Sequence, residues 1–167
     1  MSRRSVLPDP DRFARKGQKK AGRAALCELE RLADLLAETR GEVEWSIEGV
    51  QGADGRPLLR LDIRAVPVLI CQRCLGPLEH AVERASLLRP VEVGTPIDQE
   101  ELENDEFDTI EVGAGLDVLE LVEDEILLAL PIVPRHEQCG SPHAAGGSKK
   151  ESPFDVLANL RGRSKRE

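Results

Sequence analysis

The sequence predicts one α+β domain, in which a curved, barrel-like antiparallel β-sheet is flanked by two amphipathic helices and carries basic flexible tails. Its length of 167 residues is typical of a single domain that buries its own core. Apolar residues recur at every second position over residues 43–65, as in half-buried strands, and at helical spacing over residues 27–38 and 117–130. Every lysine lies within residues 1–24 or 149–167, which favours solvated ends around a folded middle.

The first expected helix covers residues 27–38. Its apolar side chains recur three and four positions apart, which places them on one face of a helix. Gly41 follows as a stop signal. The apolar side chains are Leu29, Leu32, Ala33 and Leu36.

Strands follow this helix. Residues 43–47 and 59–65 alternate between apolar and polar side chains, and Asp54-Gly55 is a turn signal between them, which predicts a hairpin. Further extended segments are expected at residues 66–70, 78–82, 87–93 and 107–112.

The second expected helix covers residues 117–130 and follows an acidic loop at residues 94–106. Asp117 is suited to cap its N-terminus, and Pro131 ends it. Val118, Val122 and Ile126 share one side of this helix, so its acidic residues are expected to face elsewhere.

Charge divides the chain into three parts. Residues 1–24 carry eight basic and two acidic side chains, a net charge of +6, and residues 149–167 carry six and three, a net charge of +3. The stretch between them holds nine basic and 26 acidic side chains, a net charge of −17. We therefore predict a basic N-terminal arm at residues 1–20, an α+β domain at residues 21–140, and a flexible linker with a short C-terminal helix at residues 141–167.

Two interpretations of this charge pattern are open. The carboxylates either solvate a small domain or form a surface that binds a basic protein. In the second case the partner-binding residues centre on the helix carboxylates, and the basic arm contacts ribonucleic acid phosphates. The candidate partner-binding residues are Glu120, Glu123, Asp124 and Glu125, and the candidate RNA contacts are Arg12, Arg15, Lys16, Lys19 and Lys20.

The cysteines supply the clearest chemical motif. Cys71 and Cys74 are separated by two residues on an expected turn, a spacing that suits two ligands of one zinc ion, and His136 and Cys139 could complete a tetrahedron. His143 is a substitute for one ligand. The alternatives are two reduced thiols without a metal, or a redox pair.

Other function classes find little support. No apolar run approaches the about 20 residues that cross a membrane, and no secretory signal is recognisable, so we expect a cytoplasmic protein without membrane association. Aromatic residues make up 2% of the chain, which disfavours an RNA-binding surface built on base stacking. The common hydrolase and phosphate-loop motifs are missing, so catalysis is not expected.

Three segments resemble a known family. They are CQRCLGP at residues 71–77, LVEDEILLALPIVPRH at residues 121–136 and SPFDVLANLR at residues 152–161, and together they are similar to the YceD family of bacterial large ribosomal RNA subunit accumulation proteins. The similarity runs from about Arg12 to Leu160. It implies ribosome biogenesis, through the synthesis, processing or stability of large-subunit ribosomal RNA, and no known catalytic activity.

Our hypothesis is a non-enzymatic assembly factor. Its acidic body would hold a basic ribosomal protein or a pre-ribosomal particle, while the basic tails touch ribosomal RNA. The rival is a zinc-dependent RNA-processing enzyme that uses Cys71, Cys74 and Cys139.

Overall fold

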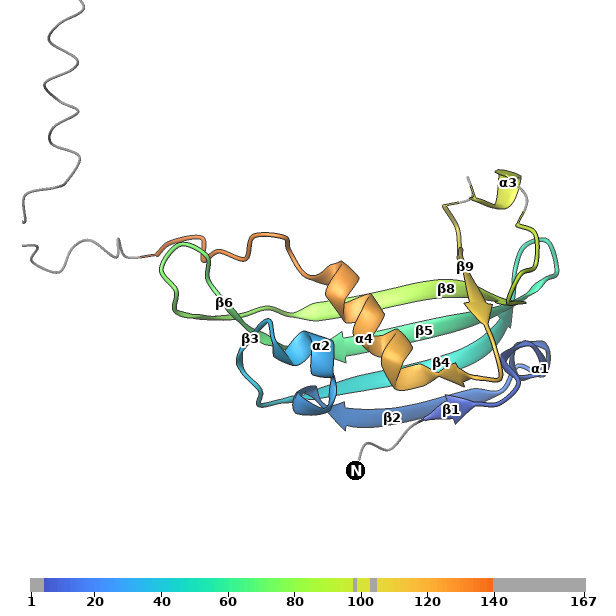
Figure 1. Ribbon diagram of the computed structural model, residues 1–167, viewed down its shortest axis with the longest axis horizontal. Helices are drawn as coiled ribbons and strands as arrows, with labels where there is room; N and C mark the ends of the chain where they lie inside the picture. The colour runs from blue at the N-terminus through green and yellow to red at the C-terminus, as the bar shows by residue number, and fades with distance from the viewer. Residues whose placement is uncertain (1–4, 98, 103–104, 140–167) are drawn as a thin grey trace, which may run out of the picture.

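The computed structural model describes residues 5–97, 99–102 and 105–139 (Figure 1). The expected linker, the C-terminal helix and the C-terminal basic tail lie outside the described residues. None of the described helices is long and apolar enough to cross a membrane.

The body of the molecule is a five-stranded sheet with the strand order β2-β4-β5-β8-β9. All neighbouring strands are antiparallel except β8 and β9, which are parallel. The sheet is open, so the expectation of a barrel-like sheet is wrong, and its antiparallel character holds for four of the five strands. The strands are β2 (Lys19–Ala25), β4 (Glu42–Gln51), β5 (Pro57–Ala65), β8 (Val82–Glu92) and β9 (Asp108–Val112).

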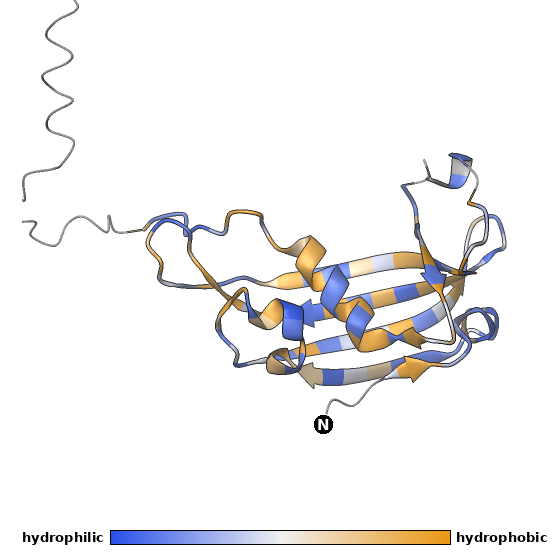
Figure 2. Ribbon diagram, in the orientation of Figure 1, coloured by the Kyte–Doolittle hydropathy of each residue, from blue (hydrophilic) through white to orange (hydrophobic). Residues whose placement is uncertain are grey.

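The predicted hairpin is confirmed as β4 and β5. The register pairs Trp45 with Ile63 and Ile47 with Leu61, so the alternating apolar residues of both strands share one buried face. At the turn, Gly55 has a φ of 77°, a left-handed conformation that glycine adopts without strain. Figure 2 shows the alternation of apolar and polar residues along the strands.

The predicted second helix is also confirmed. It is α4 (Val118–Ala129), and the Asp117 side chain caps it by accepting a hydrogen bond of 3.0 Å from the Leu119 backbone N–H. Val118, Val122 and Ile126 are fully buried against the sheet, so α4 covers one of its faces (Figure 1). Burial of such a side chain stabilises the fold by about 1.5–3 kcal/mol.

The prediction of one helix over residues 27–38 is wrong. The chain instead forms a short 3-10 helix (Leu26–Glu28), the single turn α2 (Glu30–Ala33) and the strand β3 (Leu36–Glu38). Leu29 lies between the first two with extended φ and ψ values of −92° and 92°, and Leu36 pairs with Leu69 of another strand.

The unstructured arm expected at residues 1–20 is wrong for residues 5–20. Strand β1 (Val6–Leu7) pairs with β10 (Leu116–Asp117), the helix α1 (Pro10–Arg15) follows, and β2 begins at Lys19. Helix α1 lies directly on Gly49 of β4, where a Cβ atom would come within 2.5 Å of the Ala14 carbonyl oxygen. This close approach explains a glycine inside a central strand.

A second, smaller sheet has the order β3-β6-β7 and lies at the end of the molecule opposite α1 (Figure 1). It adds β6 (Val68–Ile70) and β7 (Pro77–Glu79) to β3. At the other end, the expected acidic loop at residues 94–106 contains the helical turn α3 (Gln99–Leu102).

Candidate metal centre

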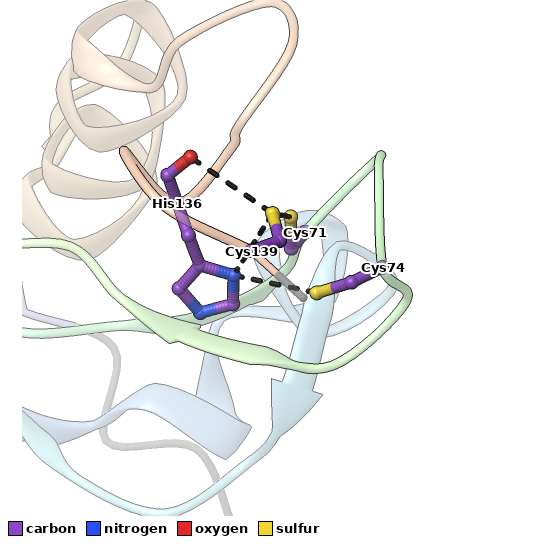
Figure 3. A group of neighbouring side chains, drawn as sticks. All are labelled: Cys71, Cys74, His136 and Cys139. Atoms are coloured by element: carbon purple, nitrogen blue, oxygen red, sulfur yellow. Dashed lines mark hydrogen bonds between the residues drawn. The ribbon is translucent and has the colours of Figure 1, made fainter. Parts of the chain in front are cut away.

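The first two candidate ligands lie on the tight turn between β6 and β7. Cys71 follows the last residue of β6, its N–H donates to the Gly76 carbonyl (2.9 Å), and its carbonyl accepts from the Leu75 N–H (2.9 Å). Leu75 has a φ of 60°, a left-handed conformation. These bonds shape the turn that carries Cys71 and Cys74, whose side chains point toward Cys139 and His136 (Figure 3).

The second pair lies on the segment that follows α4. Pro131 cannot continue the helix, and the chain then passes beside the turn, where the Gln72 N–H donates to the Pro134 carbonyl (2.8 Å). This contact brings His136 and Cys139 to the first pair.

The four ligand atoms lie within 4.8 Å of one another (Figure 3). The Cys71 and Cys139 sulfurs are 3.6 Å apart, and the His136 Nδ1 atom is 3.4 Å from the Cys74 sulfur and 3.8 Å from the Cys139 sulfur. Tetrahedral zinc, with bonds of about 2.3 Å to sulfur and about 2.0 Å to nitrogen, places two sulfurs about 3.8 Å apart and a sulfur and a nitrogen about 3.5 Å apart. The arrangement therefore fits one zinc ion.

The orientation of His136 also fits a ligand. Its Nε2 atom is 2.9 Å from the Pro77 carbonyl oxygen, a contact in which Nε2–H is the donor. Nδ1 is the nitrogen that faces the sulfurs, and a backbone carbonyl behind the ring is the usual support of a metal-bound histidine.

The thiols differ in their acidity. Burial alone would raise the pKa of the fully buried Cys71, but hydrogen bonds from the backbone of Cys74 and His136 outweigh it and lower the pKa to about 5. Burial and the hydrogen bond with Cys71 raise the pKa of Cys139. The backbone around Cys71 thus favours its thiolate, the form that binds a metal.

The cluster consists of the four residues that the sequence singled out. The substitute ligand His143 lies outside the described residues, and Cys27 is exposed and does not belong to the cluster. Four protein donors complete a tetrahedron and leave no position for a water or a substrate, as in structural zinc sites.

Two of the four helix carboxylates predicted to bind a partner, Glu123 and Glu125, are buried. Glu123 is 6% exposed and accepts hydrogen bonds from the backbone N–H groups of Arg31 (2.7 Å) and Leu32 (3.0 Å), so it caps α2 from α4. It also pairs with the Arg31 side chain (2.9 Å). Glu123 is therefore not available to a partner, and its assignment to the binding surface is corrected.

The assignment of Glu125 to the binding surface is also corrected, because Glu125 is buried as well. It is 4% exposed, and its Oε2 atom accepts hydrogen bonds from the Ser86 hydroxyl (2.5 Å) and from Arg84 (2.8 Å) of β8. Glu120 is exposed, and Asp124 is half-exposed and pairs with Arg31 (2.6 Å).

The candidate RNA contacts lie on α1, directly after it and at the start of β2. Arg15 pairs with Asp11 (2.7 Å) and Lys19 with Glu48 (2.9 Å). The other three, Arg12, Lys16 and Lys20, have no ion pair within the described residues.

Sequence reasoning overlooked two arginines beside the metal centre. Arg73 lies between Cys71 and Cys74, and Arg135 directly precedes His136, and both are exposed. Their positions beside predicted metal ligands in the sequence could have indicated that they lie close together.

The chain is similar to known proteins over most of its length. A family model described as "Large ribosomal RNA subunit accumulation protein YceD" matches residues 59–161. A protein of the same description from Haemophilus influenzae is 29% identical over 168 aligned residues, which cover 92% of this chain and 93% of that protein. No solved structure matches the chain at a significant level. The match includes all four candidate ligands.

Proposed function

This chain belongs to the YceD family, whose description links it to the accumulation of large-subunit ribosomal RNA, and on that premise we propose that it is a non-enzymatic ribosome biogenesis factor. The observation that carries the proposal is the family match over residues 59–161. The family indicates no catalytic role. The protein would raise the amount of large-subunit ribosomal RNA by binding its precursors or the proteins that assemble on them.

The acidic body supports binding to a basic ribosomal protein or a pre-ribosomal particle. With Glu123 and Glu125 buried, the accessible carboxylates around α2 and α4 form what we term the α2–α4 acidic surface. A surface of one charge sign speeds the encounter with a partner of the opposite sign. Its exposed residues are Glu28, Glu30, Asp34 and Glu120.

The α1 region supports contact with ribosomal RNA. Arg12, Lys16 and Lys20 have no carboxylate partner in the described part of the chain, so their charges are free to bind phosphates. Arg15 and Lys19 can join them by exchanging a carboxylate for a phosphate.

Zinc in this proposal is structural. Cys71, Cys74, His136 and Cys139 would hold it, and it would tie the turn between β6 and β7 to the segment after α4. A zinc-dependent RNA-processing enzyme would need an open coordination position, which four protein donors do not leave.

Co-sedimentation with pre-ribosomal particles tests the proposal. We expect the full chain to migrate with large-subunit precursors at low salt and to dissociate as salt is raised. The triple variant Arg12→Gln, Lys16→Gln, Lys20→Gln should dissociate at lower salt than a control of equal charge, Arg40→Gln, Arg60→Gln, Arg64→Gln, whose arginines are ion-paired. The proposal fails if the wild-type chain is absent from particles at every salt concentration.

The rival enzyme is tested separately. Metal analysis of the purified chain should find one zinc per chain, and precursor ribosomal RNA incubated with the zinc-loaded protein should remain intact. Zinc-dependent cleavage that Cys74→Ser abolishes would establish the enzyme instead.

A further inference from the structure

The ion pairs of the described residues leave few cations unpaired. Of the fifteen arginine and lysine side chains in this part of the chain, ten pair with a carboxylate. An exposed cation that is already paired has to give up its carboxylate to bind a phosphate, whereas an unpaired one does not. The unpaired side chains are Arg12, Lys16, Lys20, Arg73 and Arg135.

The five unpaired cations form two groups at opposite ends of the molecule. Arg12 lies on α1, Lys16 directly follows this helix and Lys20 lies on β2, at the end where α1 covers β4 (Figure 1). Arg73 and Arg135 lie at the other end, on the β6–β7 turn and on the segment after α4 (Figure 1). The acidic body lies between them.

We infer that the metal-centre end is a second contact surface for ribosomal RNA, in which Arg73 and Arg135 bind backbone phosphates. The inference rests on the proposed function, because it names a further contact with the same RNA. It adds a surface that lies apart from α1.

The segments that form the metal centre fix the positions of the two arginines. The Nη2 atom of Arg73 donates to the Cys139 carbonyl (3.0 Å), which orients the guanidinium group and leaves its other N–H groups for a ligand. Arg135 lies between Pro134 and His136 in the sequence. The Pro134 carbonyl accepts a hydrogen bond from the Gln72 N–H, so the segment is fixed on both sides of Arg135. Both arginines therefore stand on segments that the four ligands join.

The surroundings favour unpaired RNA. Leu75 and Ile132 belong to the same two segments and are 76% and 99% exposed. The guanidinium planes of the two arginines can stack on base faces, which single strands offer and duplexes hide. Arginine also binds phosphate through two parallel hydrogen bonds.

The acidic residues of these segments limit the strength of this end alone. Glu79 and Glu137 are exposed there, so two arginines bind phosphate weakly by themselves. A strand that reaches both ends gains from the second contact without a second loss of translational freedom. An RNA strand that contacts both groups would therefore bind more tightly than one that contacts the metal-centre end alone.

Salt-dependent binding to a labelled single-stranded RNA of mixed sequence tests the inference, with fluorescence anisotropy as the readout. Each phosphate contact to a single strand contributes about 0.7 to the slope of log K against log salt. We expect Arg73→Gln, Arg135→Gln to lower the magnitude of the slope by about 1.4 relative to wild type. Arg73→Lys, Arg135→Lys, which keeps both charges, should restore most of it.

The matched control is Arg60→Gln, Arg64→Gln. It removes the same charge from two exposed arginines of β5 that pair with Asp62 and Glu83. Zinc content is measured for every variant, so that a damaged metal centre is recognised, and the lysine variant remains informative if the glutamine variant loses zinc.

Three outcomes separate the hypotheses. If wild type binds the RNA and the two glutamine variants have equal slopes, the inference is wrong and the proposed function stands. If Arg73→Gln, Arg135→Gln loses particle association with an unchanged RNA slope, this end binds a protein, which also overturns the inference. If wild type associates with neither RNA nor particles, the proposed function itself fails.

Discussion

The two ends of the described fold are built on different principles. In the body, α4 and the five-stranded sheet enclose fully buried side chains such as Ile47, Leu61 and Ile126. At the metal-centre end, Leu69 and Cys71 are buried, but Ile70, Leu75, Ile132 and Val133 are 40–99% exposed. The body is therefore stabilised by removing apolar surface from water, whereas the other end is joined by a few hydrogen bonds and by four side chains whose arrangement fits one zinc ion.

Because of this difference, we expect substitutions in the two regions to affect different properties. Substitutions in the body should change the free energy of unfolding, and substitutions at the metal-centre end should change local order and binding. The following predictions are ordered by their expected effect on the stability of the body.

The largest effect is expected from Ile126→Ala. It leaves a cavity between α4 and the sheet and should lower the free energy of unfolding by about 2–5 kcal/mol in urea titrations. Leu128→Ala is the control, because Leu128 lies on the same helix and is 71% exposed, and its effect should stay within about 0.5 kcal/mol. Equal losses for both variants would contradict the described packing of α4.

A smaller loss is expected from Glu123→Ala. It leaves the backbone N–H groups of Arg31 and Leu32 without their acceptor, which should destabilise the protein by about 1–3 kcal/mol. Asp124→Ala removes only the half-exposed ion pair with Arg31 and should cost under about 1 kcal/mol. If the order of the two variants were reversed, the role of Glu123 as the cap of α2 would be wrong.

Loss of the metal should leave the body nearly unchanged. With Cys74→Ser or a zinc chelator, hydrogen exchange should accelerate at residues 68–79 and 131–139. The body should lose less than about 1 kcal/mol, because none of the four cluster residues belongs to the hydrophobic core cluster. Cys27→Ser is the control, since this exposed cysteine lies outside the cluster. Global unfolding on chelation would show that the two regions fold as one.

The smallest effect on stability is expected from Glu120→Gln. Its side chain is exposed, so the free energy of unfolding should change by less than about 0.5 kcal/mol. Within the proposed function it should weaken particle association at low salt by a few-fold, because it removes one charge from the α2–α4 acidic surface. A drop in stability like that of Glu123→Ala would remove Glu120 from that surface.

Local periodicity in the sequence predicted the elements whose conformation depends on near neighbours. The β4–β5 hairpin and α4 follow from alternation, a turn signal and a capping aspartate. The pattern over residues 27–38 predicted the burial of its leucines, since Leu29, Leu32 and Leu36 are buried and Ala33 is half-buried, but it did not predict their conformation. Leu36 is extended because it pairs with Leu69, a contact that no local pattern reports.

The candidate site was likewise predictable only in part. The paired spacings of Cys71 with Cys74 and of His136 with Cys139 carry the metal chemistry, and the structure brings them together. The acidic residues of α4 could not be sorted from the sequence, because their burial depends on Arg31, Arg84 and Ser86 from other elements.

The position of β2 limits how the N-terminal region can be studied. It is the edge strand of the five-stranded sheet, and residues 19 and 20 are its first two residues. Truncation at residue 20 would strip α1 from Gly49 and leave part of β4 with an unpaired row of backbone groups, a template for aggregation. The region therefore has to be probed by replacing side chains in the intact chain.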